Sequence, residues 1–337
     1  MKKGLIICIA LITVMSVLVL TGCGDSGTEM TLHLSYGDRT GIYNGDVNDE
    51  GIPDGQGTFE TTNSSGSKWT YTGSFKNGHF EGEGEIAWAS GQKEIGVYHD
   101  DEIQPEPAEE VANMYKNPDE YKYHCFEITG KVFNVIGSSD GQLHFQLYEN
   151  IEQSDNNTYV IYNGDMDLKE DDYVRVVGVV QGTEEYDNLI GGTTSAVVVF
   201  SDKMEVLSYI DAVSPTLKEV KVDKSQSQYG YEVTVEKVEF APEETRVYVN
   251  VKNGGKATFS LYTFDAIAVQ NGKQYKHEDN WEADYPEIQT DLRAGNSTEG
   301  ILVFKGLEQK DFKVIMNAYS EDWDETLKDY EIEVKVD

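Results

Sequence analysis

A tyrosine- and glycine-punctuated repeat in the first hundred residues constrains the fold of this chain more than any other feature. Its best copy starts at Tyr71, reads Tyr-x-Gly-x-Phe-x-Asn-Gly and is followed by a Gly-x-Gly pair; an earlier copy starts 28 positions before, at Tyr43. Asn77-Gly78 supplies the positive φ angles of a tight hairpin turn, and the Gly-x-Gly pair lets neighbouring backbones approach closely. We therefore predict stacked β-hairpins over residues 31–100.

This pattern resembles the MORN repeat. The first copy has one extra residue between Tyr43 and Gly55, and a third copy, residues 91–98, has Glu94 where the family has tyrosine. Stacked hairpins need about three units or a cap, so we expect this block to lean on a flanking element or domain. The family implies membrane contact. Fifteen acidic residues against four basic ones between Gly24 and Gln104 disfavour headgroup binding. What the resemblance implies for this chain is therefore a spacer or protein-contact role.

The turn after Tyr43 is similar to the start of a calcium loop, with the sequence Asp-Val-Asn-Asp-Glu-Gly over residues 46–51. Position twelve of that loop falls on Gly57, where a bidentate glutamate is needed, and no helices flank it, so an EF-hand is excluded. Two interpretations remain. Asp46, Asn48 and Asp54 form either a weak calcium site or an ordinary polar hairpin turn, and we favour the turn. No other cofactor is predicted.

The N-terminus resembles a bacterial lipoprotein signal. Lys2-Lys3 precede a largely apolar run that ends in Leu20-Thr21-Gly22-Cys23. This order predicts removal of residues 1–22 and lipidation of the Cys23 thiol. The alternative is an uncleaved membrane anchor, which we disfavour because the run is shorter than the roughly 20 residues of a spanning helix. We expect a lipid-anchored protein on the extracytoplasmic face of a cell membrane, of the Gram-positive type.

The chain is strongly acidic, with 61 acidic and 27 basic residues and a net charge of −34. Loss of Lys2 and Lys3 with the signal lowers this charge to −36. Nucleic acid and anionic lipid headgroups would be repelled, so neither is a predicted partner. A solvated surface that keeps an exported protein soluble accounts for the acidity. After processing, Cys125 is the one thiol left beside lipidated Cys23, so no internal disulfide forms, and its strand-like surroundings predict a buried, inert group.

The second block, residues 109–212, follows a proline-containing linker at residues 101–108. A short helix with Val111, Met114 and Tyr115 on one face comes first, and alternating strands are predicted at residues 126–135, 142–149, 158–162 and 173–180. The runs 128–132 and 169–180 resemble the first and fourth strands of an OB-fold of the tRNA-anticodon-like variety. This resemblance implies a five-stranded barrel.

An OB barrel usually presents a face for oligonucleotides or oligosaccharides. Residues 105–212 hold 21 acidic and six basic residues, which disfavours nucleic acid. Alternation along the second strand places His144, Gln146 and Tyr148 outside the barrel, where they could meet sugar or peptide. The alternative, which we favour, is that these three are simply solvent-facing strand residues.

The third block, residues 213–337, reads as seven short strands with a clear turn at Asn271-Gly272, which predicts a β-sandwich. The runs 245–253 and 292–304 are similar to an uncharacterised family of Ig-like domains carried by Gram-positive lipoproteins, and that family implies no catalytic residues. Trp281 and Tyr285 lie in its longest loop. They could mark a contact surface, but we favour core-capping by Trp281, and likewise by Trp323.

Sequence motifs for catalysis are few. No two of the six histidines have metal-ligand spacing, which predicts no zinc site. Neither a Gly-x-Ser-x-Gly elbow nor a phosphate-binding loop is present. With 61 carboxylates, pairs of acidic residues carry no information about glycosidase chemistry.

We therefore predict a mainly β, multidomain chain: MORN-like β-hairpin repeats, an OB-like five-stranded barrel and an Ig-like β-sandwich. The predicted function is a non-catalytic binding, spacer or protein-interaction role for a surface lipoprotein, with a surface protein or a cell-wall glycan as partner. The alternative is an exported hydrolase that acts on cell-wall glycan or peptide, with its site in the OB-like or Ig-like loops.

Overall fold

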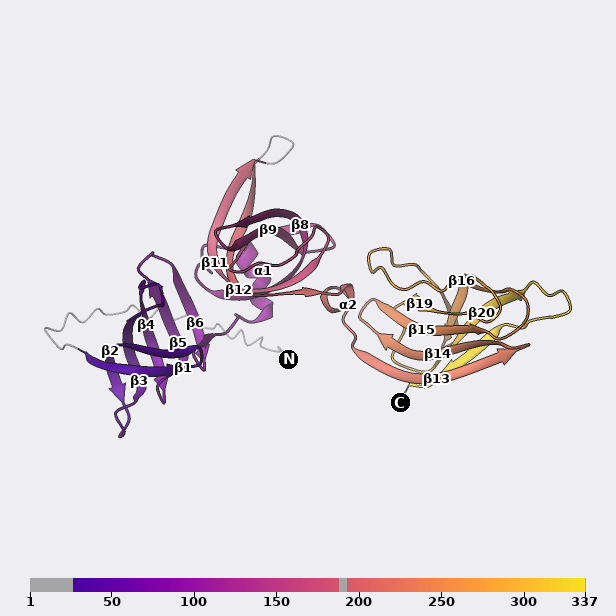
Figure 1. Cartoon of the computed structure of the whole chain (residues 1–337), viewed down its shortest axis with the longest axis horizontal. Helices are drawn as coiled ribbons and strands as arrows, with labels where there is room; N and C mark the ends of the chain where they lie inside the picture. Colours follow the sequence, from indigo (N-terminus) through magenta and orange to yellow (C-terminus); the bar gives the residue numbers. More distant parts are fainter. Residues whose placement is uncertain (1–26, 188–192, 337) are drawn as a thin grey trace, which may run out of the picture. The chain divides into compact units, whose positions relative to one another are not determined.

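The computed structural model describes residues 27–187 and 193–336, which form several separate β-sheets and very little helix (Figure 1). This confirms the expected mainly β, multidomain fold class. The chain divides into two compact units between Gln104 and Pro105, inside the stretch expected as a linker. The first residues of that stretch belong to the sheet, because Glu102–Ile103 form its last strand.

The first unit is an antiparallel sheet of seven strands in sequence order. Its strands are β1 (Thr28–Leu34), β2 (Gly37–Val47), β3 (Pro53–Thr62), β4 (Lys68–Lys76), β5 (His79–Trp88), β6 (Lys93–His99) and β7 (Glu102–Ile103). The Asn77-Gly78 turn has the expected positive φ angles of 50° and 88°. The turn after the third copy, Asp100-Asp101, has 48° and 70° although neither residue is glycine.

The repeat has a physical basis in a buried tyrosine that lies over two glycines. The Tyr71 hydroxyl donates to the Ser74 carbonyl at 2.9 Å, and the Tyr43 hydroxyl donates to the carbonyl three residues on at 2.6 Å. Gly73 and Gly84 pair directly across the strands beneath the Tyr71 ring. A methyl group at Gly84 would come within 2.5 Å of the Tyr71 hydroxyl oxygen, so these glycines make room for the ring.

The first strand closes this unit. Leu32 and Leu34 of β1 join the aromatic core formed by Tyr43, Phe59, Trp69, Tyr71, Phe75, Phe80 and Tyr98. The sheet is curled, so that β1 approaches β5 although three strands separate them in the sheet. The hairpins therefore pack against strand β1 of their own unit. This strand begins at Thr28, three residues before the expected start of the repeat block at residue 31.

The barrel of the second unit follows two short helical segments, η1 (Ala108–Glu110) and α1 (Val111–Lys116). Its strands are β8 (Cys125–Ser139), β9 (Gln142–Asn150), β10 (Asp155–Tyr162), β11 (Tyr173–Asp187) and β12 (Thr193–Leu207). They close in the order β10-β12-β11-β8-β9, with β10 and β12 parallel and the other pairs antiparallel. The five-stranded barrel is therefore present. The sequence patterns named four of its strands and missed β12.

Met114 of α1 is fully buried in the barrel core, and Val111 and Tyr115 pack beside it, as the helical spacing predicted. A one-turn helix, α2 (Tyr209–Ala212), follows the barrel, and Ser208 caps it by accepting a hydrogen bond from the Asp211 amide at 3.1 Å.

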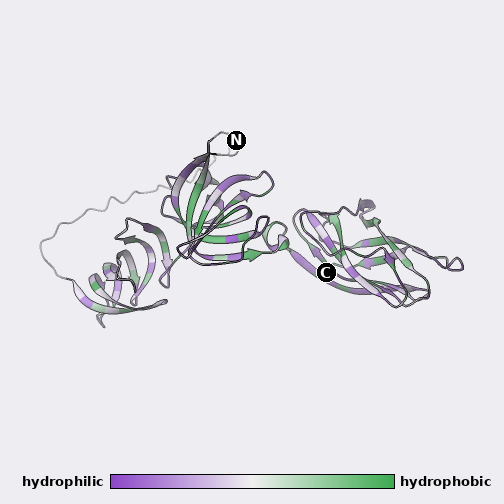
Figure 2. Ribbon diagram, turned by 45° about the horizontal axis from the view of Figure 1, so that its top comes forward, coloured by the Kyte–Doolittle hydropathy of each residue, from purple (hydrophilic) through white to green (hydrophobic). Residues whose placement is uncertain are grey.

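The sandwich consists of two packed sheets. One is β13-β14-β15-β19, with β13 (Lys218–Gln228), β14 (Tyr231–Phe240), β15 (Glu244–Asn253) and β19 (Ser297–Lys305). The other is β17-β16-β20-β21, with β16 (Phe259–Gln270), β17 (Lys273–Lys276), β20 (Phe312–Ser320) and β21 (Tyr330–Val334), and β18 (Asp291–Leu292) pairs with β16. Hydrophobic and hydrophilic residues alternate along these strands (Figure 2), and Val247, Val249 and Val251 face the core.

Two glutamines cover an edge of the second sheet. The Gln226 side chain of β13 donates to the Asp329 carbonyl and accepts from the Glu331 amide. The Gln228 side chain donates to the Lys328 carbonyl and accepts from the Lys328 amide. These amides take up backbone groups that an open edge strand would offer to another chain. Within the described parts of the chain, no helix has the length and apolar character needed to cross a membrane.

We predict that Gly73→Ala destabilises the first unit by about 1–3 kcal/mol, because the added methyl group would lie 2.7 Å from the Tyr71 hydroxyl and 2.6 Å from the Gly84 backbone. Gly96→Ala is the matched control: it occupies the same repeat position, but Glu94 replaces the tyrosine and the nearest atom is the flexible end of Ile103 at 3.2 Å. Calorimetry of the chain from residue 24 should show a clearly lower melting temperature for the first variant. Equal shifts for both would contradict the tyrosine–glycine packing.

Candidate functional site

Uncharged polar and aromatic side chains gather on the outside of three barrel strands, which we call the β8–β9–β10 face. Its members are Phe133, Asn134, His144, Gln146, Tyr148, Asn157 and Tyr159. In the strand register, Asn134 and Tyr159 both lie opposite Gln146, one on each side. Residues 143, 145 and 147 fill the barrel core, so the alternation that predicted an outward trio is confirmed.

Neighbouring members of this face contact one another. The rings of Phe133 and Tyr148 stack with centroids 3.9 Å apart and planes at 15°. Asn134 Nδ2 donates to Gln146 Oε1 at 2.8 Å, and His144 Nδ1 lies 2.8 Å from Tyr159 Oη. Gln146 is only 6% exposed, while His144 and Tyr148 are half-buried. The favoured interpretation of three solvent-facing strand residues is therefore wrong for Gln146, which the side chains of neighbouring strands cover, while His144 and Tyr148 stay partly exposed.

The members of the face carry amide, phenol, imidazole and phenyl groups and no carboxylate. A tyrosine phenol is protonated at neutral pH, and burial, together with the charge of Glu184, raises the pKa of Tyr159 further. Lys131 lies directly opposite Tyr148 on β8, and its ammonium is paired with Asp171 at 3.1 Å. The seven named members therefore form an uncharged group that can both donate and accept hydrogen bonds, bordered by this ion pair.

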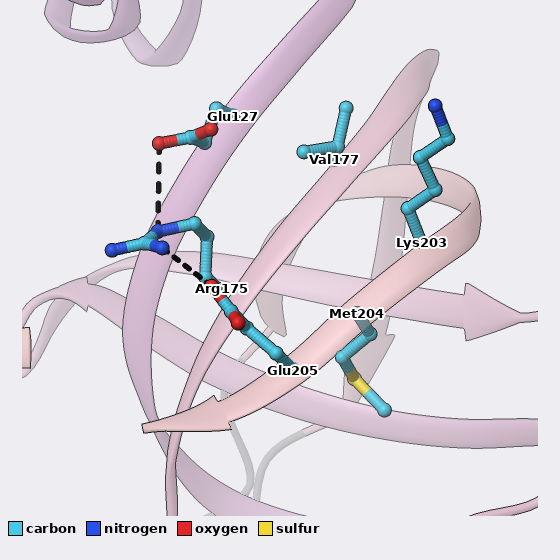
Figure 3. A pocket seen from close by; sticks show the side chains of 6 residues that line it. All are labelled: Glu127, Arg175, Val177, Lys203, Met204 and Glu205. Atoms are coloured by element: carbon cyan, nitrogen blue, oxygen red, sulfur yellow. Dashed lines mark hydrogen bonds and ion pairs between the residues drawn. The ribbon is translucent and has the colours of Figure 1, made fainter. Parts of the chain in front are cut away.

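A second concavity on the barrel, of about 310 Å³, is lined by Glu127, Arg175, Val177, Lys203, Met204 and Glu205 (Figure 3). Arg175 lies between two carboxylates: its Nε is 3.5 Å from Glu127 Oε1, and its Nη1 donates to Glu205. The arginine is thus already paired on both sides, and this concavity serves as a cross-strand ion-pair site joining β8, β11 and β12.

The exposed tryptophans of the sandwich correct one expectation. Trp281 is 81% exposed and Trp323 is 91% exposed, so core-capping by these residues is wrong. Each lies in a loop that reaches into solvent instead of folding over the core. Trp281 and the half-buried Tyr285 line a small cleft of about 90 Å³ with His277, Asp279 and Asp284, but the Tyr285 hydroxyl is committed elsewhere, as the next contacts show.

Arg246 lies fully buried at the centre of a polar network in the sandwich. Its guanidinium donates to Glu239 at 3.1 Å, to Glu244 at 2.8 Å and to the Ser214 carbonyl at 2.8 Å. The Tyr285 hydroxyl donates to the same Glu244 oxygen at 2.5 Å. Burial alone would raise the pKa of Glu244, but hydrogen bonds from Tyr285, Asn280 and Arg246 outweigh it and hold that pKa below its ordinary value.

The three residues considered for calcium each serve a local hydrogen bond. Asn48 Oδ1 accepts from the amides of Glu50 and Ile52, both at 3.0 Å. Asp46 accepts from the Gln56 amide at 3.1 Å, and Asp54 accepts from the Asn77 amide at 3.2 Å. These contacts are those of ordinary hairpin turns. A weak calcium site at these positions stays a prediction.

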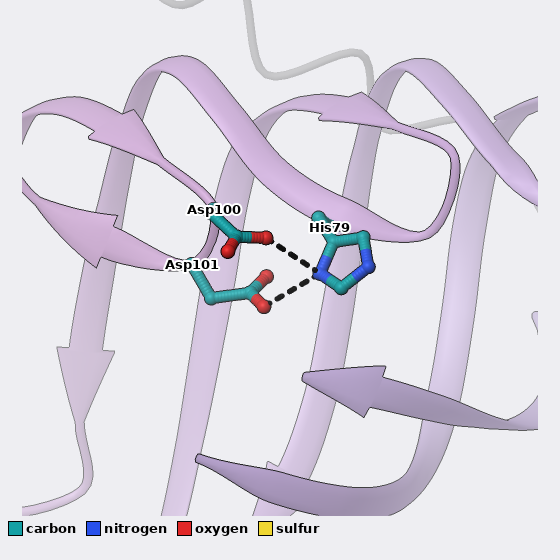
Figure 4. Close-up of side chains that lie close together, drawn as sticks. All are labelled: His79, Asp100 and Asp101. Atoms are coloured by element: carbon teal, nitrogen blue, oxygen red, sulfur yellow. Dashed lines mark hydrogen bonds and ion pairs between the residues drawn. The ribbon is translucent and has the colours of Figure 1, made fainter. Parts of the chain in front are cut away.

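A histidine and two aspartates that are far apart in the sequence meet in the first unit (Figure 4). His79 Nδ1 lies 2.7 Å from Asp101 Oδ2 and 3.5 Å from Asp100 Oδ1. The hydrogen bond to Asp101 raises the pKa of His79 against the opposing effect of burial, and the Asp100 and Glu81 charges add to the rise. A search for paired histidines missed this group. The hairpin register would have found it, because Gly82 pairs with Tyr98 and the same alignment sets His79 opposite Asp101.

Cys125 is buried at the start of β8, as predicted. The lipidation residue Cys23 and the preceding Leu20, Thr21 and Gly22 lie outside the described residues. Their assignment as a lipoprotein signal therefore remains a prediction from sequence.

Comparisons with known proteins leave the family open. No family model and no curated protein sequence matches this chain. A functionally unknown protein from Listeria monocytogenes EGD-e is similar over 39% of this chain and 94% of its own, with 10% identity and a TM-score of 0.31. A conserved domain protein from Bacillus anthracis is similar over 93% of this chain and 99% of its own, with 9% identity and a TM-score of 0.29. Neither similarity is high enough to carry an argument about fold or function.

The Arg246 network predicts acid sensitivity of the sandwich. Because the folded pKa of Glu244 is below its ordinary value of 4.5, its contribution to stability is complete above that pH and is lost as the pH falls through the lower folded value. Glu244→Gln should cost about 1–3 kcal/mol at neutral pH, because Arg246 loses one of its two carboxylate partners and keeps Glu239. The variant should also lose less stability than the unaltered chain as the pH falls.

Denaturant unfolding of the sandwich transition, followed by circular dichroism at several pH values, tests this expectation. Exposed Glu321 provides the control: Glu321→Gln should leave both the stability and its pH dependence nearly unchanged. If the free energy of unfolding fell as steeply with decreasing pH in Glu244→Gln as in the unaltered chain, the assigned role of Glu244 would be contradicted.

Proposed function

We propose that this chain is a lipid-anchored, extracytoplasmic binding protein whose β8–β9–β10 face recognises an uncharged glycan. The observation that carries the proposal is the gathering of neutral hydrogen-bonding groups and aromatic rings on three adjacent barrel strands, in a chain that is otherwise strongly acidic. The OB-like, MORN-like and Ig-like family assignments belong to this proposal and rest on the sequence motifs.

Sugar recognition fits the chemistry of this face. The exposed side of a stacked ring such as Tyr148 offers an apolar platform to the C–H face of a pyranose. The partly exposed Asn134 lies beside it, oriented by its hydrogen bond to Gln146. Its amide matches hydroxyl and acetamido groups, which donate and accept hydrogen bonds. A neutral sugar avoids the repulsion that a phosphate-rich ligand would meet from this acidic chain.

A binding role is favoured over hydrolysis by the kinds of side chain on the face. A glycosidase of the usual kind needs two carboxyl groups on either side of the scissile bond. The seven members of the face have none, and His144, a potential general base, is held in a contact with Tyr159 at 2.8 Å. The alternative of an exported hydrolase would therefore need a site elsewhere, for example in the loop that carries Trp281.

Lipidation of Cys23 would place the first unit beside the membrane. Strand β1 begins at Thr28, five residues after Cys23, and five residues span at most about 18 Å. The sheet would then act as a membrane-proximal spacer, in line with the role that the repeat suggests.

For anchoring, we predict that Cys23→Ser gives a released protein or an unprocessed precursor, because this residue supplies the thiol at the processing site. Cys8→Ser, inside the signal, is the control and should be processed and lipidated normally. Mass spectrometry of the membrane fraction reads out both. An unlipidated N-terminus on the unaltered protein would end this account of anchoring.

For glycan binding, we predict that the soluble chain from residue 24 retains a β-linked N-acetylglucosamine oligomer without cleaving it. Tyr148→Ala should weaken binding by about tenfold or more, since it removes the stacking platform, whereas Trp323→Ala, at a 91% exposed tryptophan of the sandwich, should not. Calorimetry measures binding and product analysis measures cleavage. Turnover would support the hydrolase alternative, and equal loss in both variants would exclude the barrel face.

A further inference from the structure

We propose that His79, Asp100 and Asp101 bind a zinc ion at the turn that ends the third repeat. One imidazole nitrogen and two carboxylate oxygens, one from each aspartate, lie within 4.8 Å of one another. The three side chains converge from the start of β5 and from the β6–β7 turn (Figure 4). This inference goes beyond glycan binding and does not depend on it.

Asp101 is held in place by groups outside the cluster. Its side chain is fully buried, with 0% exposure. The Phe80 amide donates to Oδ1 at 2.7 Å, and the Ser35 amide donates to Oδ2 at 2.7 Å. Metal-ligating carboxylates commonly have such outer hydrogen bonds, which fix their orientation before the ion arrives. The structure thus supplies an oriented ligand and not merely an acidic surface.

The spacing of the donor atoms is close to that around a small divalent ion. Zinc binds nitrogen and oxygen ligands at about 2.0–2.2 Å, which sets neighbouring donors roughly 3–3.5 Å apart. His79 Nδ1 is 2.7 Å from Asp101 Oδ2 and 3.5 Å from Asp100 Oδ1. The His79–Asp101 contact would have to lengthen by about 0.5 Å to admit an ion. The His79 side chain is 36% exposed and that of Asp100 is 69% exposed, so both face solvent into which they can move. The hydrogen shared by Nδ1 and Asp101 now lies where the ion would sit.

The donor set and the local charge select the kind of ion. Imidazole nitrogen favours zinc and other transition metals, whereas calcium and magnesium prefer sites made of oxygen alone. The Asp100, Asp101 and Glu81 charges all act on His79, so a dication gains from their combined field. Three protein ligands leave a coordination position open to water or to a partner.

Zinc chloride alone is the probe, titrated by calorimetry into the soluble chain from residue 24 at about pH 8, where the metal can replace the imidazole proton. We expect one tight equivalent. Asp100→Asn, at an exposed residue whose loss leaves the fold intact, should weaken that binding by about tenfold or more, and His79→Gln should abolish it. His33→Gln is the matched control, because His33 Nδ1 lies 2.8 Å from a single exposed carboxylate, Asp38.

The inference is overturned by three results: absence of a tight equivalent, equal weakening by His33→Gln and Asp100→Asn, or displacement of the zinc by an equal concentration of calcium. The last two would mean an adventitious ion only, held by the general acidity of the chain. If His79→Gln fails to fold, the comparison of Asp100→Asn with His33→Gln decides the question by itself.

Discussion

Burial of apolar side chains in three separate cores is the interaction on which the rest of this structure depends. Cys125 is the only cysteine in the described parts of the chain, so no disulfide can form among those residues. The sheet is centred on stacked Tyr71 and Phe80, whose ring centroids are 3.8 Å apart. The barrel closes around Phe145 and Val160, and the sandwich around Phe259 and Phe304. Each part must therefore reach stability through its own packing.

Two buried charged groups then fix details that apolar packing leaves open. In the sheet, Asp101 ties the β1–β2 turn to β5 through its two backbone hydrogen bonds, and its left-handed φ of 70° is held by the same contacts. In the sandwich, Arg246 links β14, β15 and the segment before β13. Such groups are costly to bury, and both here are fully bonded, which is why they define a single arrangement.

Much of the architecture was predictable because strand alternation and turn residues act locally. Strand β9 covers the expected residues 142–149, and the turn at Asn77-Gly78 has the expected backbone. Strand β12 was missed because its unbroken valine run, residues 197–199, lacks alternation; it lies in a closed barrel beside a parallel partner. The exposure of Trp281 could not be predicted, since a loop's path depends on contacts that composition does not encode.

The candidate sites were likewise predictable in part: strand alternation placed some of their residues, and strand pairing placed the others. Alternation alone placed His144, Gln146 and Tyr148 on one outer face, but their partners Phe133 and Asn134 come from β8, across bulges that shift the register. Those bulges bring a ring and an amide to the centre of the face. The His79 group likewise required strand pairing, because its members are 21 and 22 positions apart in the sequence.

The most direct test of the central claim is a crystal structure of the soluble chain with a β-linked N-acetylglucosamine oligomer bound. We predict one pyranose ring stacked on Tyr148 and an acetamido group in hydrogen-bond contact with Asn134. An oligomer found in the loop of Trp281, or no bound sugar at saturating concentration, would contradict the assignment of the β8–β9–β10 face as the binding surface.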